Sequence, residues 1–239
     1  MRTALQDARR IVAPRRDDPD GPLPQLLLGL TVVTGFVDAY SYLALGHVFV
    51  ANMTGNVVFL GFALAGAKGF SVAASLLALG AFALGAVWGG RLGARSGRSR
   101  TRLLAVAVAV EAALVGASLI VAVTAAAPGS GWARFVLIAL LGLTMGGQNA
   151  VARKLAVPDL TTTVLTLTIT GMFADGRPAG GTSSKVGRRI LSPIAMFGGA
   201  ILGALLILHV ASWLSIGVAL AILCLVAARA GLHARRTEP

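Results

Sequence analysis

The chain has 239 residues, of which 56% are hydrophobic and only 13% are charged. A soluble domain carries about 25% charged residues, so this composition excludes a soluble globular protein and indicates one that lies in a membrane. The net charge is +12, but the basic residues gather between apolar runs, which favours loops on the cytoplasmic side over nucleic-acid binding.

The apolar runs are long and continuous, which predicts membrane helices rather than the alternating strands of a β-barrel. A spanning helix needs about 20 mostly apolar residues. The runs cover residues 25–45, 48–67, 70–90, 103–125, 132–151, 159–174, 190–209 and 211–228.

The polar ends of the chain lie outside these runs. Residues 1–24 mix arginines and aspartates with four prolines, which predicts a disordered cytoplasmic tail. No clear small-residue cleavage site follows the first run, so we expect it to be an uncleaved helix. Residues 25–229 are expected to form a single helical membrane domain, and residues 230–239 a second cytoplasmic tail.

The basic loops decide how many runs cross the membrane, because Lys and Arg accumulate on the cytoplasmic side. If all eight runs span, either the arginine-rich loop at 91–102 or the tails and the loop at 177–189 lie outside. If 48–67 and 159–174 instead enter and leave on one side, every basic cluster lies inside, and only Lys68 and Arg134 fall outside.

The fold class predicted is therefore an all-α polytopic membrane protein with six to eight hydrophobic segments. Six full spans and two broken or re-entrant segments form two weakly similar, inverted halves, at about 25–125 and 132–229. The similarity of the halves rests on the alignment of Gly35–Ala39 with Gly146–Ala150. Short or interrupted segments at matching places in two halves are typical of a transporter site.

Four motifs resemble the YoaK/DUF1275 family of bacterial integral membrane proteins. They are Gly35–Ala39, Phe49–Asn56, Gly146–Ala150 and Asp159–Thr166, and the resemblance covers roughly residues 25–230. The string Asn-Met-Thr-Gly-Asn at 52–56 is the most specific of them. The resemblance implies about six spans and a bacterial source, and it implies no settled activity.

Asp38 is the sharpest functional candidate, because a carboxylate inside a span costs about 2.5–3.5 kcal/mol and usually faces a cavity or a partner. It could carry a proton or bind a cation; alternatively, it is a structural residue that hydrogen-bonds the backbone around Asn52 and Asn56. Glu111 in the fourth run is a second buried acid. Snorkelling of its side chain toward the basic loop would explain it without a function.

Polar side chains on or beside the two short segments are candidates for binding a small solute. Their carbonyl, hydroxyl and amide groups also serve helix-to-helix hydrogen bonding, which is the plainer alternative. The predicted substrate-binding set is Asp38, Asn52, Thr54, Asn56, Gln148, Asn149, Thr162, Thr163 and Thr166.

Other chemistry is disfavoured. The histidines have no Glu or Cys partner at metal-ligand spacing, so we expect no metal and no cofactor. No HExxH or GxSxG motif is present, which disfavours an enzyme. Glycines of the later spans are expected to allow close helix packing, which is also compatible with a homo-oligomer; these are Gly80, Gly85, Gly89, Gly198, Gly199 and Gly203.

The function predicted is a small transporter or permease for an unidentified solute or ion, with proton coupling through Asp38. Half-helix N-termini at the site would favour an anionic group. The main alternative is a non-transporting membrane scaffold or assembly protein, which explains the small-residue contacts but explains the buried polar residues poorly. The expected location is the bacterial inner membrane, with both termini cytoplasmic and lipid as the surroundings, and without a nucleic-acid partner.

Overall fold

The computed structural model describes residues 20–95, 99–125, 129–157, 165–174 and 189–237, and its regular secondary structure in these ranges is helical. Six helices are long and apolar enough to cross a membrane, which confirms the predicted fold class. They are α2 (Leu23–Ala44), α4 (Val72–Arg95), α5 (Arg100–Thr124), α6 (Gly131–Leu155), α9 (Leu191–His209) and α10 (Ser212–Thr237). They coincide with the six runs expected to span.

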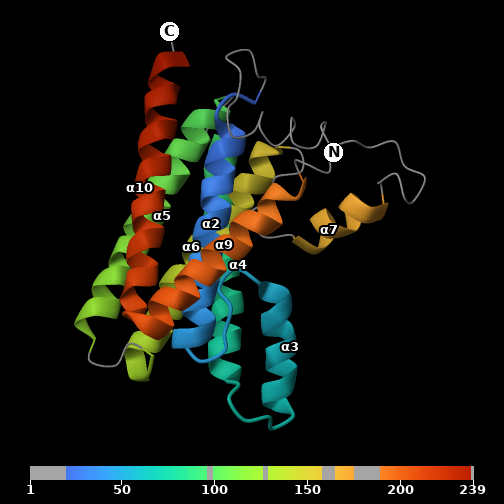
Figure 1. Cartoon of the computed structure of the whole chain (residues 1–239), viewed down its shortest axis with the longest axis vertical. Coiled ribbons are helices and arrows are strands. Elements are labelled where there is room, and N and C mark those ends of the chain that lie inside the picture. The colour runs from blue at the N-terminus through green and yellow to red at the C-terminus, as the bar shows by residue number, and fades with distance from the viewer. Residues whose placement is uncertain (1–19, 96–98, 126–128, 158–164, 175–188, 238–239) are drawn as a thin grey trace.

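The segment 48–67 contains a helix too short to cross the membrane. Its helix α3 (Met53–Leu64) has 12 residues, about 18 Å at 1.5 Å per residue, against a hydrocarbon core of roughly 30 Å. After α2 the chain turns back along the bundle, and α3 then returns to the end that it came from (Figure 1). Two consecutive left-handed residues, Gly46 and His47, make the turn.

The second short segment is described only in part. Helix α7 (Leu165–Ala174) has 10 residues and is likewise too short to span. The preceding residues 158–164 lie outside the described structure. In Figure 1, α3 lies at the end of the bundle opposite the C-terminus, whereas α7 lies in the other half of the view.

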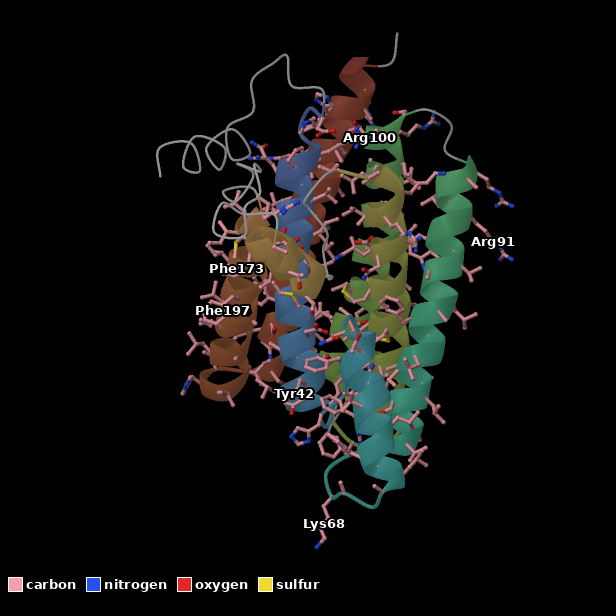
Figure 2. All side chains as sticks on the ribbon, turned by 90° about the vertical axis from the view of Figure 1, so that its right-hand side faces the viewer. Tyr42, Lys68, Arg91, Arg100, Phe173 and Phe197 are labelled. Carbon is pink, nitrogen blue, oxygen red and sulfur yellow. The ribbon has the colours of Figure 1, made fainter. Side chains whose placement is uncertain are left out.

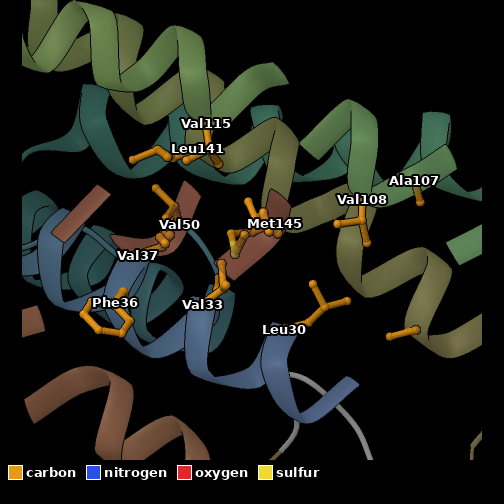
Figure 3. Close-up of a cluster of buried hydrophobic side chains, with 14 of the residues drawn as sticks. Leu30, Val33, Phe36, Val37, Val50, Ala107, Val108, Val115, Leu141 and Met145 are labelled. Atoms are coloured by element: carbon orange, nitrogen blue, oxygen red, sulfur yellow. The ribbon is translucent and has the colours of Figure 1, made fainter. Parts of the chain in front are cut away.

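Helices α2 and α6 run antiparallel through the middle of the bundle (Figure 1). Helix α2 packs on α9 and α10, and α6 packs on α4 and α5. The side chains between these helices form one apolar core, which includes Leu30, Val37, Leu141 and Met145 (Figure 3). The outward faces carry large exposed apolar side chains, such as Leu202 on α9, as expected of a surface that meets lipid.

Two helix crossings are so close that only glycine fits. A Cβ added to Gly35 in α2 would lie 2.3 Å from the carbonyl oxygen of Met196 in α9. A Cβ added to Gly146 in α6 would lie 2.0 Å from the carbonyl oxygen of Phe82 in α4. Gly199 and Gly85 face these glycines from the opposite helices, which confirms that they allow close packing. Gly80 and Gly198, expected to do the same, face open space.

The two crossings are equivalent residue by residue. A Cβ on Gly199 would meet the carbonyl oxygen of Val32 at 2.3 Å, and a Cβ on Gly85 would meet that of Leu143 at the same distance. Val32 and Leu143 each precede the facing glycine, Gly35 or Gly146, by three positions. Because α2 and α6 are antiparallel, the two halves form an inverted repeat. In it, α2 of the first half packs on α9 of the second, and α6 of the second half packs on α4 of the first.

Basic residues gather at one end of the bundle. Asp20 and Arg100 form an ion pair there at 3.0 Å, and the Arg100 guanidinium also donates to the carbonyl of Leu155. Arg91 and Arg100 lie toward this end, and Lys68 lies at the other (Figure 2). We call these the basic end and the α3 end. Arg134 also lies at the α3 end, where it donates to the Gly46 carbonyl oxygen over 3.3 Å. The division agrees with the six-span arrangement predicted from the loops.

Candidate functional site

Asp38 connects α2 to the extended chain that leads into α3. Its carboxylate oxygen Oδ1 accepts a hydrogen bond from the backbone N–H of Ala51 over 3.1 Å, and the residue is 5% exposed. Asp38 lies six residues before the end of α2, about 9 Å along the helix axis. The carboxyl therefore holds the returning chain inside the bundle, which is the structural role weighed for this residue from the sequence.

Asn56 holds the same extended segment from the other side. Its Oδ1 accepts from the backbone N–H of Phe49 at 2.9 Å, and its Nδ2 donates to the carbonyl oxygen of Phe49 at 2.6 Å. The backbone N–H and carbonyl of Phe49 are thus both hydrogen-bonded, although Phe49 lies outside any helix or strand. Asn56 is the buried residue of α3 and is fully shielded. Buried backbone needs such partners, because an unmade hydrogen bond costs about 1–3 kcal/mol.

An aromatic cluster packs around the same turn. The ring of Phe49 stacks on those of Tyr42 and Phe59, with centroids 5.0 and 5.7 Å apart. Phe70, just before α4, contacts Phe59 at 5.1 Å. Gly55 lies under Phe49, where an added Cβ would come within 2.8 Å of the ring. Hydrogen bonds and ring stacking together fix the re-entrant segment.

Asn52 and Thr54 lie at the start of α3 with exposed side chains. Asn52 is the N-cap, and its Oδ1 accepts from the Gly55 N–H over 3.5 Å, which is a long bond. The Asp38 carboxyl lies beside this helix start, because it is bonded to the N–H of Ala51, the residue before the N-cap. Asn52 and Thr54 are thus the members of the Asn-Met-Thr-Gly-Asn string that remain available to a solute.

Gln148 and Asn149 on α6 lie apart from α3. The Gln148 Nε2 donates to the hydroxyl of Thr34 at 2.9 Å and to the carbonyl of Leu30 at 3.5 Å, so that it ties α6 to α2. Asn149 donates to the carbonyl of Met145 in its own helix over 2.9 Å. The structure brings Asp38 and Asn56 together at the re-entrant segment, whereas Gln148 lies beside the turn of α2 that precedes Asp38.

The second short segment supplies three residues of the predicted substrate-binding set. Thr166 is exposed on α7. Thr162 and Thr163 lie outside the described residues. Their assignment to a solute site stays a prediction.

A buried polar stripe on α2 was missed from the sequence. Thr31, Thr34, Asp38 and Ser41 follow one another at helical spacings of three or four and are all buried. The spacing was a readable signal, since such positions share one helix face. Thr31 and Thr34 donate to carbonyls of their own helix. The Thr34 hydroxyl also accepts a hydrogen bond from the Gln148 amide, so Thr34 belongs to the contact between the two halves.

Two hollows lie away from α3. One of about 480 Å³ is apolar and lies over α9, lined by Pro193, Met196 and Phe197 among others. The other, of about 210 Å³, lies between α2 and α10 and includes Gln25 and Arg229. Neither includes residues of the predicted substrate-binding set, so the two hollows do not define its entrance.

The described residues contain no group of three or more His, Cys, Asp or Glu side chains that could hold a metal ion. His47 faces the Gly69 carbonyl oxygen at 3.3 Å and packs edge-on against Tyr42. It shapes the turn at the α3 end.

These features define a multi-pass α-helical membrane protein built as an inverted repeat, with a re-entrant segment fixed by buried polar side chains. The chain belongs to the family described as "Protein of unknown function (DUF1275)", whose model matches residues 26–229. It is 35% identical over 150 residues to UPF0700 transmembrane protein YoaK of Bacillus subtilis (strain 168). That match covers 63% of this chain and 65%, just under two thirds, of the relative. No solved structure matches the chain.

Proposed function

We propose that the protein is a small transporter or permease for a polar solute, with its site at the start of α3. The observation that carries the proposal is an inverted repeat combined with a half-helix that begins inside the bundle. Solute sites of secondary transporters lie between such repeats and use interrupted helices. A scaffold needs close helix contacts but has no need of a backbone break at membrane depth.

The roles of the side chains follow from their contacts. Asp38 and Asn56 hold the backbone from Phe49 to Ala51 in place, and the exposed Asn52 and Thr54 contact the solute. The Asp38 carboxyl beside the helix start favours neutral or cationic polar solutes over the anionic group expected from the helix dipole alone. Asp38 couples transport to a proton only if its bond to Ala51 breaks and forms again during the cycle.

The orientation follows from the charges. Among the residues that the structure describes, the basic end carries most of the arginines, and the rule for loops assigns that end to the cytoplasm. Both described ends of the chain, at Asp20 and near Arg235, lie there. We propose on this basis that the protein lies in a bacterial inner membrane with both termini inside.

Proteoliposomes test the transport proposal. Uptake of radiolabelled alanine, glucose, glycerol, potassium and chloride is compared for the wild type and the Asn52→Leu/Thr54→Val double variant. At least one probe is expected to enter through the wild type and to enter severalfold more slowly through the variant. The control is Thr124→Val, an exposed threonine on α5 whose hydroxyl bonds its own helix. A wild type that moves no member of a widened panel, but retains a partner protein through purification, favours the scaffold.

Cysteine labelling tests the orientation. In a Cys224→Ser background, a cysteine at Lys68 is expected to react with an impermeant maleimide added outside intact cells. A cysteine at Arg95 is expected to react only after the cells are opened. Ser96 and Ser183, which lie outside the described residues, are also expected to label only from the cytoplasm. Outside labelling at position 95 would reverse the orientation.

A further inference from the structure

Glu111 is a buried carboxyl that none of the roles above explains. It lies 11 residues into α5, about 16 Å from the start of the helix, and is fully shielded. Neither carboxyl oxygen has a hydrogen-bond partner. The side chain does not reach the basic end, as snorkelling would require. Orphaned carboxyl oxygens are costly in a low-dielectric interior, so something must neutralise the charge.

Apolar residues flank Glu111 on the same face of its own helix. Val108 and Val115 are three and four residues away on α5, and hence on the same helix face. Both belong to the core cluster with Leu141 and Met145 of α6 (Figure 3). On α10, Leu223 is buried in the same cluster. Hard metal cations take about six oxygen ligands, and the described residues hold no group of three or more His, Cys, Asp or Glu side chains that includes Glu111.

A second orphaned acceptor lies at a similar depth. The Arg100–Leu155 contact fixes the register of the antiparallel helices α5 and α6. Counting 11 residues from each places Glu111 opposite Thr144, one turn from Gln148. Gln148 uses its Nε2 on Thr34 and Leu30, but its buried Oε1 has no partner. The core thus holds two unpaired acceptor groups about one helical turn apart along the bundle, and a proton on Glu111 supplies a donor where there was none.

No cation of the described chain neutralises Glu111. On its own helix, Arg100 is bonded to Asp20 and Leu155, and Arg102 is exposed. The basic residues of the helices packed on α5 lie near helix ends; these are Arg91 and Arg95 on α4, Arg134, Arg153 and Lys154 on α6, and Arg229, His233 and Arg235 on α10. Cys224 of α10 is exposed. On α2, Asp38 is bonded to Ala51. Tyr40 of α2 has a buried hydroxyl that makes no hydrogen bond.

We propose that Glu111 is a proton-binding site in the core, which holds one exchangeable proton about one helical turn from the depth of Gln148. The bound proton neutralises the carboxyl and turns it from a pure acceptor into a donor for the unpaired oxygens around it. Release of the proton leaves a bare charge between α5 and α6. Protonation of Glu111 therefore stabilises the packing of α5 against α6. The site holds whether or not the protein transports a solute, so its test stands apart from that of the proposed function.

Infrared difference spectroscopy on the purified full-length protein in lipid tests the proposal. The carboxylic C=O stretching band, which is separate from the carboxylate band, is followed as the pH is raised. One buried band is expected to shift in D₂O and to fall about tenfold per pH unit above its midpoint. It is expected to be absent in Glu111→Gln and present in Asp38→Asn. Loss of the band in Asp38→Asn but not in Glu111→Gln would assign the proton to Asp38 and overturn the proposal.

A second measurement uses the wild type alone, in case Glu111→Gln does not fold. Dicyclohexylcarbodiimide reacts with protonated carboxyls in apolar surroundings, and the modified peptide is found by mass spectrometry. Modification of Glu111 is expected, with a yield that falls as pH rises and is the same in sodium and in potassium. Protection by sodium at constant pH would mean that a metal ion rather than a proton neutralises the carboxyl. That result, or a Glu111 that stays unmodified at every pH, would contradict the proposal.

Discussion

The two halves of the molecule share a helix crossing but differ in the side chain that follows it. Gly35 and Gly146 lie in matching contacts with α9 and α4. Three residues later, the first half has Asp38, which reaches the backbone of Ala51, and the second has Asn149, which donates to its own helix. The repeat therefore provides the same helix crossing in both halves, and the position that follows it carries an acid in the first half and an amide in the second.

The surroundings of the two short helices extend this difference. Around α3, the described contacts include stacking of Tyr42, Phe49 and Phe59 and both bonds of Asn56. For α7, the described contacts include one from the Arg189 guanidinium to the Gly171 carbonyl. Substitutions at matched positions of the two halves measure how much each half depends on these contacts.

The largest loss of stability is expected when alanine replaces a glycine at one of the two close helix crossings. Gly146→Ala places a Cβ 2.0 Å from a backbone oxygen, and Gly35→Ala places one at 2.3 Å. Backbone cannot move aside as a flexible side chain can, so each variant is expected to lose about 3 kcal/mol or more of unfolding free energy. Thermal unfolding in detergent, followed by size-exclusion chromatography, measures the loss.

Gly198→Ala and Gly80→Ala are the matched controls, since their added Cβ atoms meet nothing within 4 Å. They are expected to unfold at or above the wild-type temperature, because alanine favours helix. If Gly35→Ala behaves like these controls while Gly146→Ala does not, the two crossings are not equivalent.

The second effect separates Asp38 from its counterpart. Asp38→Ala removes the acceptor for the Ala51 N–H and is expected to cost about 2–3 kcal/mol. In Asn149→Ala, at the matching position of the second half, loss of the bond to the Met145 carbonyl accounts for about 1 kcal/mol, because that carbonyl keeps its helical partner. Unfolding in mixed micelles at increasing dodecyl sulfate gives both values. Equal losses would mean that the first half is not specially anchored.

The third effect divides the Asn-Met-Thr-Gly-Asn string. Asn56→Ala leaves the N–H and the carbonyl of Phe49 without their partner and is expected to cost about 1–2 kcal/mol. Asn52→Ala removes one long, exposed cap bond and is expected to cost about 0.5 kcal/mol. Limited proteolysis between residues 45 and 52 follows the release of the segment. Faster cleavage is expected in Asn56→Ala only, and the reverse order would reassign the two asparagines.

Much of this arrangement could be predicted from the sequence, because hydrophobic length and loop charge act locally. The six spans and the non-spanning run at 48–67 follow from these two signals. The spacing of Gly85 and Gly89 indicated close packing as well. It did not reveal the partner helix, since a small-residue face fits any helix of suitable shape.

The contacts of the site were less predictable. Asp38 bonds a backbone amide of an extended segment, and backbone donors carry no sequence signature. Gln148 was grouped with Asn52 as a solute ligand, but it bonds Thr34 across the two halves. Only the three-dimensional register of α2 and α6 reveals this pairing. The lack of a partner for Glu111 is likewise a property of the neighbouring helices.

The smallest effect is expected at the basic end, where α2 and α5 begin. Asp20→Asn keeps the shape of the side chain but removes its ion pair with Arg100; the Arg100 side chain is 40% exposed and that of Asp20 is 17% exposed. Exposed pairs contribute about 0.2–1 kcal/mol, and salt screens them. The unfolding temperature is therefore expected to fall slightly at low ionic strength and to match the wild type in molar salt. A loss as large as that of Asp38→Ala, or one that salt does not reduce, would show that the first half depends on this contact as much as on its re-entrant anchor.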